Sequence, residues 1–76
     1  MPHVVVKLYA GRTEAQKTKL AEEIVKAVMA GVGSAEESIS VGVEDVAPGD
    51  WTEKVYKPDI ADKWDTLYKK PGYDPA

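Results

Sequence analysis

The residue whose chemistry stands out is Pro2, which follows Met1 and leads straight into the β-rich segment 3–8. Removal of Met1 would free the secondary amine of Pro2, which can take up a proton without any side chain. An α-amino group has a pKa of about 7.7–8.0, and proline's secondary amine is more basic. An apolar pocket and a nearby cation both lower such a pKa towards the working pH, where a general base is most effective. Pro2 is therefore a candidate base, although proline at position two is also common without a catalytic role.

Arg12 is a candidate anion-binding residue. It ends the predicted turn 10–12, in which Gly11 is free to adopt positive φ, and it immediately precedes a predicted helix. Free backbone amides at a helix N-terminus favour anions, and a guanidinium binds a carboxylate through two parallel N–H groups. We hypothesise that Arg12 binds a carboxylate; the alternative is a solvated arginine in a turn.

A strand and a helix position these two residues. Residues 3–9 are predicted to form a strand because apolar side chains alternate along them. Thr13 and Gln16 have the spacing of a capping box, which starts a helix. Gly31 and Gly33 are expected to end it. The helix carries apolar side chains one turn apart at Leu20, Ile24 and Val28.

A second strand is predicted over residues 38–46, where Ile39, Val41 and Val43 alternate with smaller or polar residues. A strand, a helix and another strand make a right-handed βαβ unit with parallel strands. The predicted fold class is therefore α/β. The helix covers only one side of a two-stranded sheet, so we expect the apolar groups on the other side to meet another subunit.

The C-terminal part is predicted to hold one short helix. A turn at 47–50 precedes Trp51, and Pro58 suits the first position of a helix, where its missing amide costs nothing. Pro71 and Gly72 are expected to end this helix, which leaves residues 73–76 as a tail. Four apolar side chains share one face of it at helical spacing: Ile60, Trp64, Leu67 and Tyr68.

The length of 76 residues predicts a single domain spanning residues 1–76. A chain this short buries only about 60% of its unfolded surface. Small domains usually need disulfides, a metal or oligomerisation. The chain has no cysteine and one histidine, so oligomerisation is the expected device.

The charge pattern excludes several classes of partner. The net charge is −3, and acidic and basic residues are interspersed, whereas a nucleic-acid-binding protein shows a clustered basic face. Neither a leader with a basic start and an apolar centre nor an apolar run of about 18 residues is visible. We expect a soluble cytoplasmic protein with no membrane partner.

The pattern as a whole resembles the 4-oxalocrotonate tautomerase family. The resemblance covers most of the chain: Pro2 after Met1, the first strand, residues 11–17 that open the helix, and residues 38–41 of the second strand. It implies a βαβ tautomerase unit whose sheet is completed by assembly into dimers or trimers of dimers. It also implies that Pro2 is the catalytic base once Met1 is removed.

The resemblance implies roles for three further residues. Arg12 would bind a carboxylate or carbonyl of the substrate, and Trp51 would line an apolar pocket, with interface packing as the alternative. Hexameric members carry a second arginine where this chain has Ser40. Ser40 would be a neutral hydrogen-bonding replacement, or simply a strand residue. His3 is more simply a surface or interface histidine than a second proton carrier.

The longer C-terminal half resembles the phenylpyruvate tautomerase-like branch, whose members are dimers that favour enolised arylpyruvates. The sequence therefore favours a cofactor-free, metal-free tautomerase of a small 2-oxo acid. Because Ser40 stands where hexameric members carry the second arginine, an aryl-substituted acid fits better than a dicarboxylate. A homodimer is expected, with a hexamer as the alternative. Two other functions stay open: a related proline-dependent hydratase or dehalogenase, and a non-catalytic, self-assembling binding module.

Overall fold

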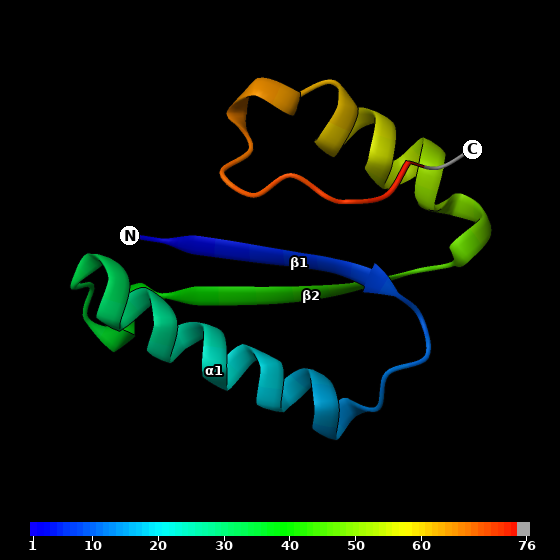
Figure 1. Cartoon of the computed structure of the whole chain (residues 1–76). Coiled ribbons are helices and arrows are strands. Elements are labelled where there is room, and N and C mark those ends of the chain that lie inside the picture. Colours follow the sequence, from blue (N-terminus) through cyan, green and yellow to red (C-terminus); the bar gives the residue numbers. More distant parts are fainter. Residues whose placement is uncertain (75–76) are drawn as a thin grey trace.

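A computed structural model describes residues 1–74, and the N-terminal part forms a βαβ unit. Strand β1 (His3–Tyr9) is followed by helix α1 (Glu14–Val32) and by strand β2 (Ser40–Val46), which lies parallel to β1 (Figure 1). Four short helical elements complete the chain: η1 (Glu36–Ser38), η2 (Pro48–Asp50), η3 (Thr52–Ala61) and η4 (Trp64–Thr66). The predicted α/β fold with parallel strands is confirmed.

The pairing of the two strands determines what each face of the sheet carries. His3 lies opposite Ser40, and the register continues to Tyr9 opposite Val46. Because side chains alternate between the faces, one face carries Val4, Val6 and Leu8 of β1 together with Val41, Val43 and Asp45 of β2. The other face carries the side chains of His3, Val5, Lys7 and Tyr9 with those of Ser40, Glu44 and Val46.

Helix α1 starts as its sequence predicts. The Gln16 amide donates to the Thr13 hydroxyl at 3.1 Å, and the Thr13 amide donates to the Gln16 side chain at 2.9 Å, which is the capping box. Of the two glycines expected to end it, Gly33 forms the cap with φ of 71°, whereas Gly31 remains helical. Only the second glycine needs the left-handed conformation that glycine adopts easily.

The second strand starts two residues later than predicted. Residues 36–38 form the single turn η1, and the Ile39 amide donates to the Glu36 carbonyl at 3.1 Å. The Ser40 amide makes the first of the bonds between the two segments, donating at 3.2 Å to the carbonyl of Pro2, the residue just before β1. Pairing with β1 therefore decides where this strand begins.

The predicted C-terminal helix is placed wrongly. Element η3 already begins at Thr52, and Pro58 lies inside it rather than at its first position. The element has π-type turns: the Asp62 amide donates to the Lys57 carbonyl, five residues earlier, at 3.0 Å. A proline inside an α-helix removes a hydrogen bond and collides with the carbonyl four residues before it, whereas wider turns relieve this crowding. Residues 62–74 form turns, η4 and irregular chain instead of a continued helix.

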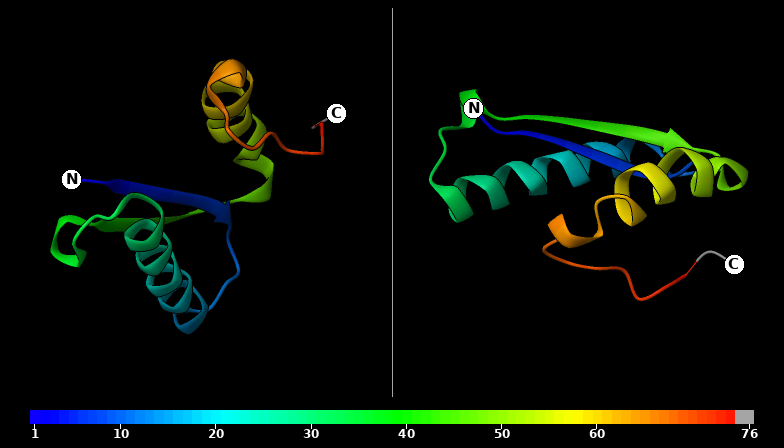
Figure 2. Two further views of the ribbon diagram at one scale, coloured as in Figure 1. Left: turned by 60° about the vertical axis from the view of Figure 1, so that its left-hand side comes forward. Right: turned by 90° about the horizontal axis from the view of Figure 1, so that it is seen from above.

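The sheet lies between α1 and the C-terminal segment. Figures 1 and 2 show α1 on one side of the strands and η3 on the other. An ion pair from Lys17 to Asp45 at 3.0 Å joins α1 to its face, and one from Lys7 to Asp59 at 2.6 Å joins η3 to the opposite face. The second face was expected to meet another subunit. Instead, the chain's own C-terminal segment covers part of it.

The interior of a single chain is thin. Among residues 1–74, Val55 is the one enclosed residue, at 4% exposure. Val5 in the middle of the second sheet face remains 47% exposed, and Val32 at the end of α1 remains 73% exposed. No helix in the described part of the chain has the length and apolar character needed to cross a membrane.

Candidate active site

Pro2 is held at the N-terminal end of the sheet. It precedes β1, is half-buried, and its carbonyl accepts the Ser40 amide at 3.2 Å. The strand pairing therefore extends one residue beyond β1 and fixes the backbone of Pro2. With Met1 attached, the Pro2 nitrogen is an amide; with Met1 removed, it is an amine at the end of an ordered strand.

Ser40 and His3 lie beside Pro2. His3 Nδ1 and Ser40 Oγ are 2.6 Å apart, which joins the two strands through their side chains as well as their backbones. Both residues are exposed to solvent. We call Pro2, His3 and Ser40 the N-terminal corner. It brings one predicted substrate-binding residue next to the predicted base.

Arg12 lines a cavity of about 220 Å³ at the other end of β1. The cavity is walled by Leu8, Arg12, Gln16, Lys17 and Leu20. Lys17 is engaged by Asp45 and by Glu14, each at 3.0 Å, and these hydrogen bonds raise the pKa of Lys17 above its ordinary value. Within residues 1–74, Arg12 makes no ion pair or side-chain hydrogen bond. Its guanidinium is therefore the positive charge of this cavity that has no acidic partner in the described chain, which suits it to binding an anion.

Trp51 belongs to an aromatic cluster at this same end. Its ring meets the ring of Tyr9 edge-to-face, with centroids 5.2 Å apart and planes at 81°. Its indole N–H donates to the Tyr73 hydroxyl at 2.9 Å, and Tyr73 in turn lies 5.6 Å from the ring of Tyr56. Residue 73, expected in a tail, therefore packs on the body of the protein; residues 75–76 of that tail lie outside the described chain.

The four predicted site residues fall into two groups at opposite ends of β1. Pro2 and Ser40 lie at its start, whereas Arg12 and Trp51 lie beyond its end. The seven residues of β1 rise about 3.3 Å each, so its ends are about 20 Å apart. Even an extended arginine side chain does not bridge this distance, and no single chain brings Pro2 and Arg12 together.

Two aromatic neighbours of Trp51 were missed by sequence reasoning. Tyr9 and Tyr73 both contact Trp51, but they come from the first strand and from the C-terminal segment. The alternation of β1 does place Tyr9 on the face opposite α1. No local signal showed that the chain returns to that face after β2.

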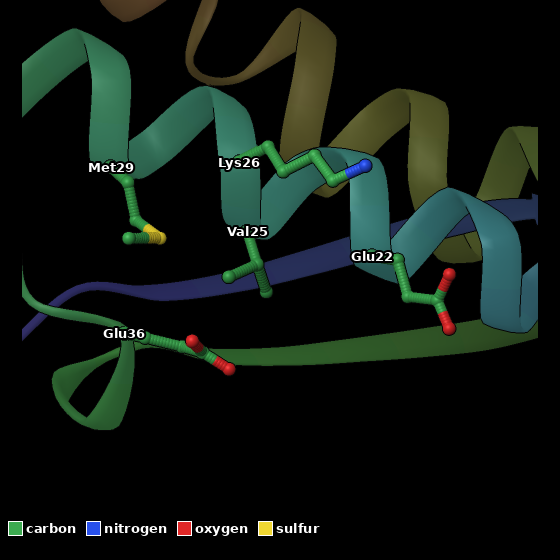
Figure 3. A pocket seen from close by; sticks show the side chains of 5 residues that line it. All are labelled: Glu22, Val25, Lys26, Met29 and Glu36. Atoms are coloured by element: carbon green, nitrogen blue, oxygen red, sulfur yellow. The ribbon is translucent and has the colours of Figure 1, made fainter.

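A further cavity of about 280 Å³ runs along α1, away from the four candidate residues. Figure 3 shows its lining: four side chains from α1 and one from η1, namely Glu22, Val25, Lys26, Met29 and Glu36. Its walls mix apolar groups with charges of both signs. None of the predicted site residues lines it.

Comparison with known proteins places this arrangement in context. The family described as tautomerase enzyme matches residues 2–54, a span that includes all four candidate residues. A probable tautomerase from Xylella fastidiosa is 41% identical over 73 residues, covering 96% of this chain and 89% of that protein. Tautomerase PptA from Cronobacter sakazakii is 37% identical over 75 residues, covering 97% of this chain and 99% of that protein.

Solved structures show the same fold. A 4-oxalocrotonate tautomerase isozyme from Methylibium petroleiphilum superposes with a TM-score of 0.64 at 36% identity, covering 66% of this chain and 81% of that one. YwhB, a homologue of 4-oxalocrotonate tautomerase, superposes with a TM-score of 0.59 at 41% identity, covering 60% of this chain and 75% of that one.

Proposed function

The chain belongs to the tautomerase family and is an isomerase, and we propose that it interconverts the keto and enol forms of a small 2-oxo acid that carries an aryl group. The amine of Pro2 is the general base in this proposal, and no cofactor takes part. Removal of Met1 is required, because an amide nitrogen has no basic lone pair.

The observation that carries this proposal is the separation of the two groups along β1. Pro2 and Ser40 lie about 20 Å from Arg12 and Trp51 within one chain. A working site therefore combines the N-terminal corner of one subunit with the Arg12 cavity of another. A two-fold dimer forms two such sites, because each subunit offers both ends. We favour this homodimer, and a hexamer built from such dimers is the alternative.

The reaction moves one proton from one atom of the substrate to another, so the substrate gains and loses no atoms overall. In the ketonising direction, the Pro2 amine accepts the proton from the enol oxygen, and the resulting ammonium delivers a proton to the C3 carbon, which regenerates the amine. The partner's guanidinium at position 12 binds the carboxylate through two N–H groups and stabilises the negative charge that develops on the enolate oxygen. A hydrogen bond from Ser40 adds to this stabilisation.

Two features support a substrate with one carboxylate and an aryl group. Arg12 is the one cation of its cavity without an acidic partner in residues 1–74, and Ser40 in the N-terminal corner is neutral. The Tyr9–Trp51 pair offers an aromatic wall close to the end of β1. Aromatic rings pack favourably against such a wall in edge-to-face or offset arrangements. The cytoplasmic location expected from the sequence remains a prediction.

The test is ketonisation of enol-phenylpyruvate followed by ultraviolet absorbance, after intact mass has shown that Met1 is absent. We expect Pro2→Ala to lower kcat by about a hundredfold, because the primary amine that remains at the N-terminus is less basic than proline's secondary amine and lacks the ring that orients it. Pro48→Ala, in the exposed turn η2, is the matched control and should leave the rate unchanged.

Two results would count against this proposal. A processed protein that leaves the enol untouched overturns the arylpyruvate assignment. A borohydride-trapped adduct between phenylpyruvate and the N-terminus shows that Pro2 acts as a nucleophile through an iminium rather than as a base.

A further inference from the structure

We propose that His3 is a positioning residue of this site: its ring holds the Ser40 hydroxyl so that the hydroxyl donates a hydrogen bond to an oxygen of the bound 2-oxo acid. The proposal rests on the proposed function, because it names a further residue of the same site. It replaces the simpler interpretation of His3 as a surface histidine.

The first support is the geometry of the pair. His3 and Ser40 are direct cross-strand neighbours, and Nδ1 and Oγ lie 2.6 Å apart, a short distance for such a bond. Both side chains are exposed, so water could satisfy either of them. Burial therefore does not force this contact. The strand register places the two groups opposite each other, and their pairing fixes the position of the serine oxygen.

The second support is the position of the pair relative to Pro2. The Ser40 amide donates to the Pro2 carbonyl at 3.2 Å, so the backbone that carries the hydroxyl is tied to the residue that carries the amine. His3 is the next residue in the chain. A substrate whose C3 carbon lies against the Pro2 amine therefore has its oxygens within the same corner.

The direction of the His3–Ser40 bond decides what Ser40 can do. A hydroxyl has one proton to donate and two lone pairs that accept. When the ring nitrogen Nδ1 carries its proton, it donates to Oγ and leaves the hydroxyl proton free for a ligand. In the other tautomer the hydroxyl donates to Nδ1 and has no proton left. A carboxylate or enolate oxygen only accepts, so binding of the acid selects the tautomer protonated at Nδ1.

The experiment uses benzoylformate, a 2-oxo acid with a phenyl group that has no hydrogen next to the carbonyl and cannot enolise. Its dissociation constant, measured by calorimetry, reports the contacts to its oxygens without any proton transfer at Pro2. We expect Ser40→Ala and His3→Ala each to weaken binding about tenfold, the usual effect of a lost hydrogen bond to a charged group. The double variant should bind no more weakly than the weaker of the two, because the residues act as one unit.

Two substitutions separate positioning from a merely structural role. Asparagine at position 3 carries its amide close to where Nδ1 lies, so His3→Asn should keep nearly the affinity of the wild type. Glutamine places its amide near the other ring nitrogen, so His3→Gln should bind as weakly as His3→Ala. Ser34→Ala, in the loop after α1, is the control and should bind normally.

The outcomes are distinct. Loss of affinity in the Ala and Gln variants with rescue by Asn supports the proposal. Unchanged affinity in the variants, additive losses in the double variant, or no binding to the wild type overturns it. Ketonisation with and without Pro2→Ala is measured on the same preparations. If Pro2→Ala does not change the ketonisation rate while the His3→Ala and His3→Gln variants still bind benzoylformate weakly, the assignment of Pro2 as the base fails and the positioning role of His3 stands.

Discussion

The indole N–H of Trp51 donates to the hydroxyl of Tyr73 at 2.9 Å, so a residue near the C-terminal end of the chain holds the ring of a residue close to the end of β2. Tyr9 contacts the same ring edge-to-face from β1. Trp51 is thus fixed from two sides before any substrate arrives. An aromatic wall held in this way costs little ordering entropy when a ligand packs on it.

If Trp51 lines the substrate pocket as proposed, this hydrogen bond should make Tyr73 matter for substrate affinity. We expect Tyr73→Phe to raise KM for enol-phenylpyruvate about two- to tenfold and to leave kcat almost unchanged, because one neutral hydrogen bond is lost far from the proton transfer. Steady-state kinetics and the emission maximum of tryptophan fluorescence measure the two effects. Tyr68→Phe is the control, because Tyr68 is fully exposed. Equal kinetics of the two variants would contradict a role for Tyr73.

Mixed subunits test the composite site. Pro2→Ala and Arg12→Ala should each be inactive alone, but random dimers of the two should recover about a quarter of the wild-type activity. The reason is that half of the dimers are mixed and each mixed dimer contains one site with both residues intact. The measurement is activity after joint unfolding and refolding of the two variants. Recovery of no activity would mean that Pro2 and Arg12 do not meet across an interface.

The cap of α1 is expected to carry stability as well as position Arg12. Thr13→Ala removes the hydroxyl that accepts the Gln16 amide at 3.1 Å, and we expect the free energy of unfolding to fall by about 1 kcal/mol. Urea titration followed by circular dichroism measures it. Thr18→Ala, on an exposed position within the helix, should destabilise far less or stabilise slightly, since alanine favours helix.

The attachment of η3 to the sheet should weaken at high pH. The hydrogen bond to Asp59 raises the pKa of Lys7 above its ordinary value of 10.5. A group with a raised folded-state pKa adds stability that is complete below the unfolded value and is lost as the pH rises through the folded one. We therefore expect the Tm advantage of the wild type over Lys7→Met to hold below pH 10.5 and to disappear above it. A constant difference across this range would show that Lys7 acts only through packing.

The parts of the fold that follow from local sequence were predictable. The alternation of apolar side chains along β1 and the capping box of Thr13 and Gln16 each depend on only a few neighbouring residues. The strand and the start of α1 could therefore be predicted from the sequence. Gly31 and Gly33 were both expected to end α1; Gly33 does so in the left-handed conformation, whereas Gly31 remains helical.

The C-terminal part could not be predicted in the same way. Pro58 fits both the start of a helix and the wide turns of η3, and contacts distant in sequence decide between them. Two such contacts are Lys7 with Asp59 and Tyr9 with Trp51.

The candidate site shows the same division. The roles of Pro2 and Arg12 were inferred from residue type and spacing, and they stay predictions. Their separation also follows from the sequence once the strand between them is recognised, because seven extended residues set its length. The link between His3 and Ser40 needed the register of the sheet, which a single strand does not contain.

Because the interior around Val55 is thin, the stability of the folded state should depend on association and therefore on protein concentration. If the same apolar surface serves both folding and association, stability follows mass action rather than sequence alone. Each tenfold dilution then removes about 1.4 kcal/mol from the association free energy of a dimer. Specific activity would fall as the protein is diluted. The amount of protein that a cell makes would therefore determine the activity per molecule as well as the total activity.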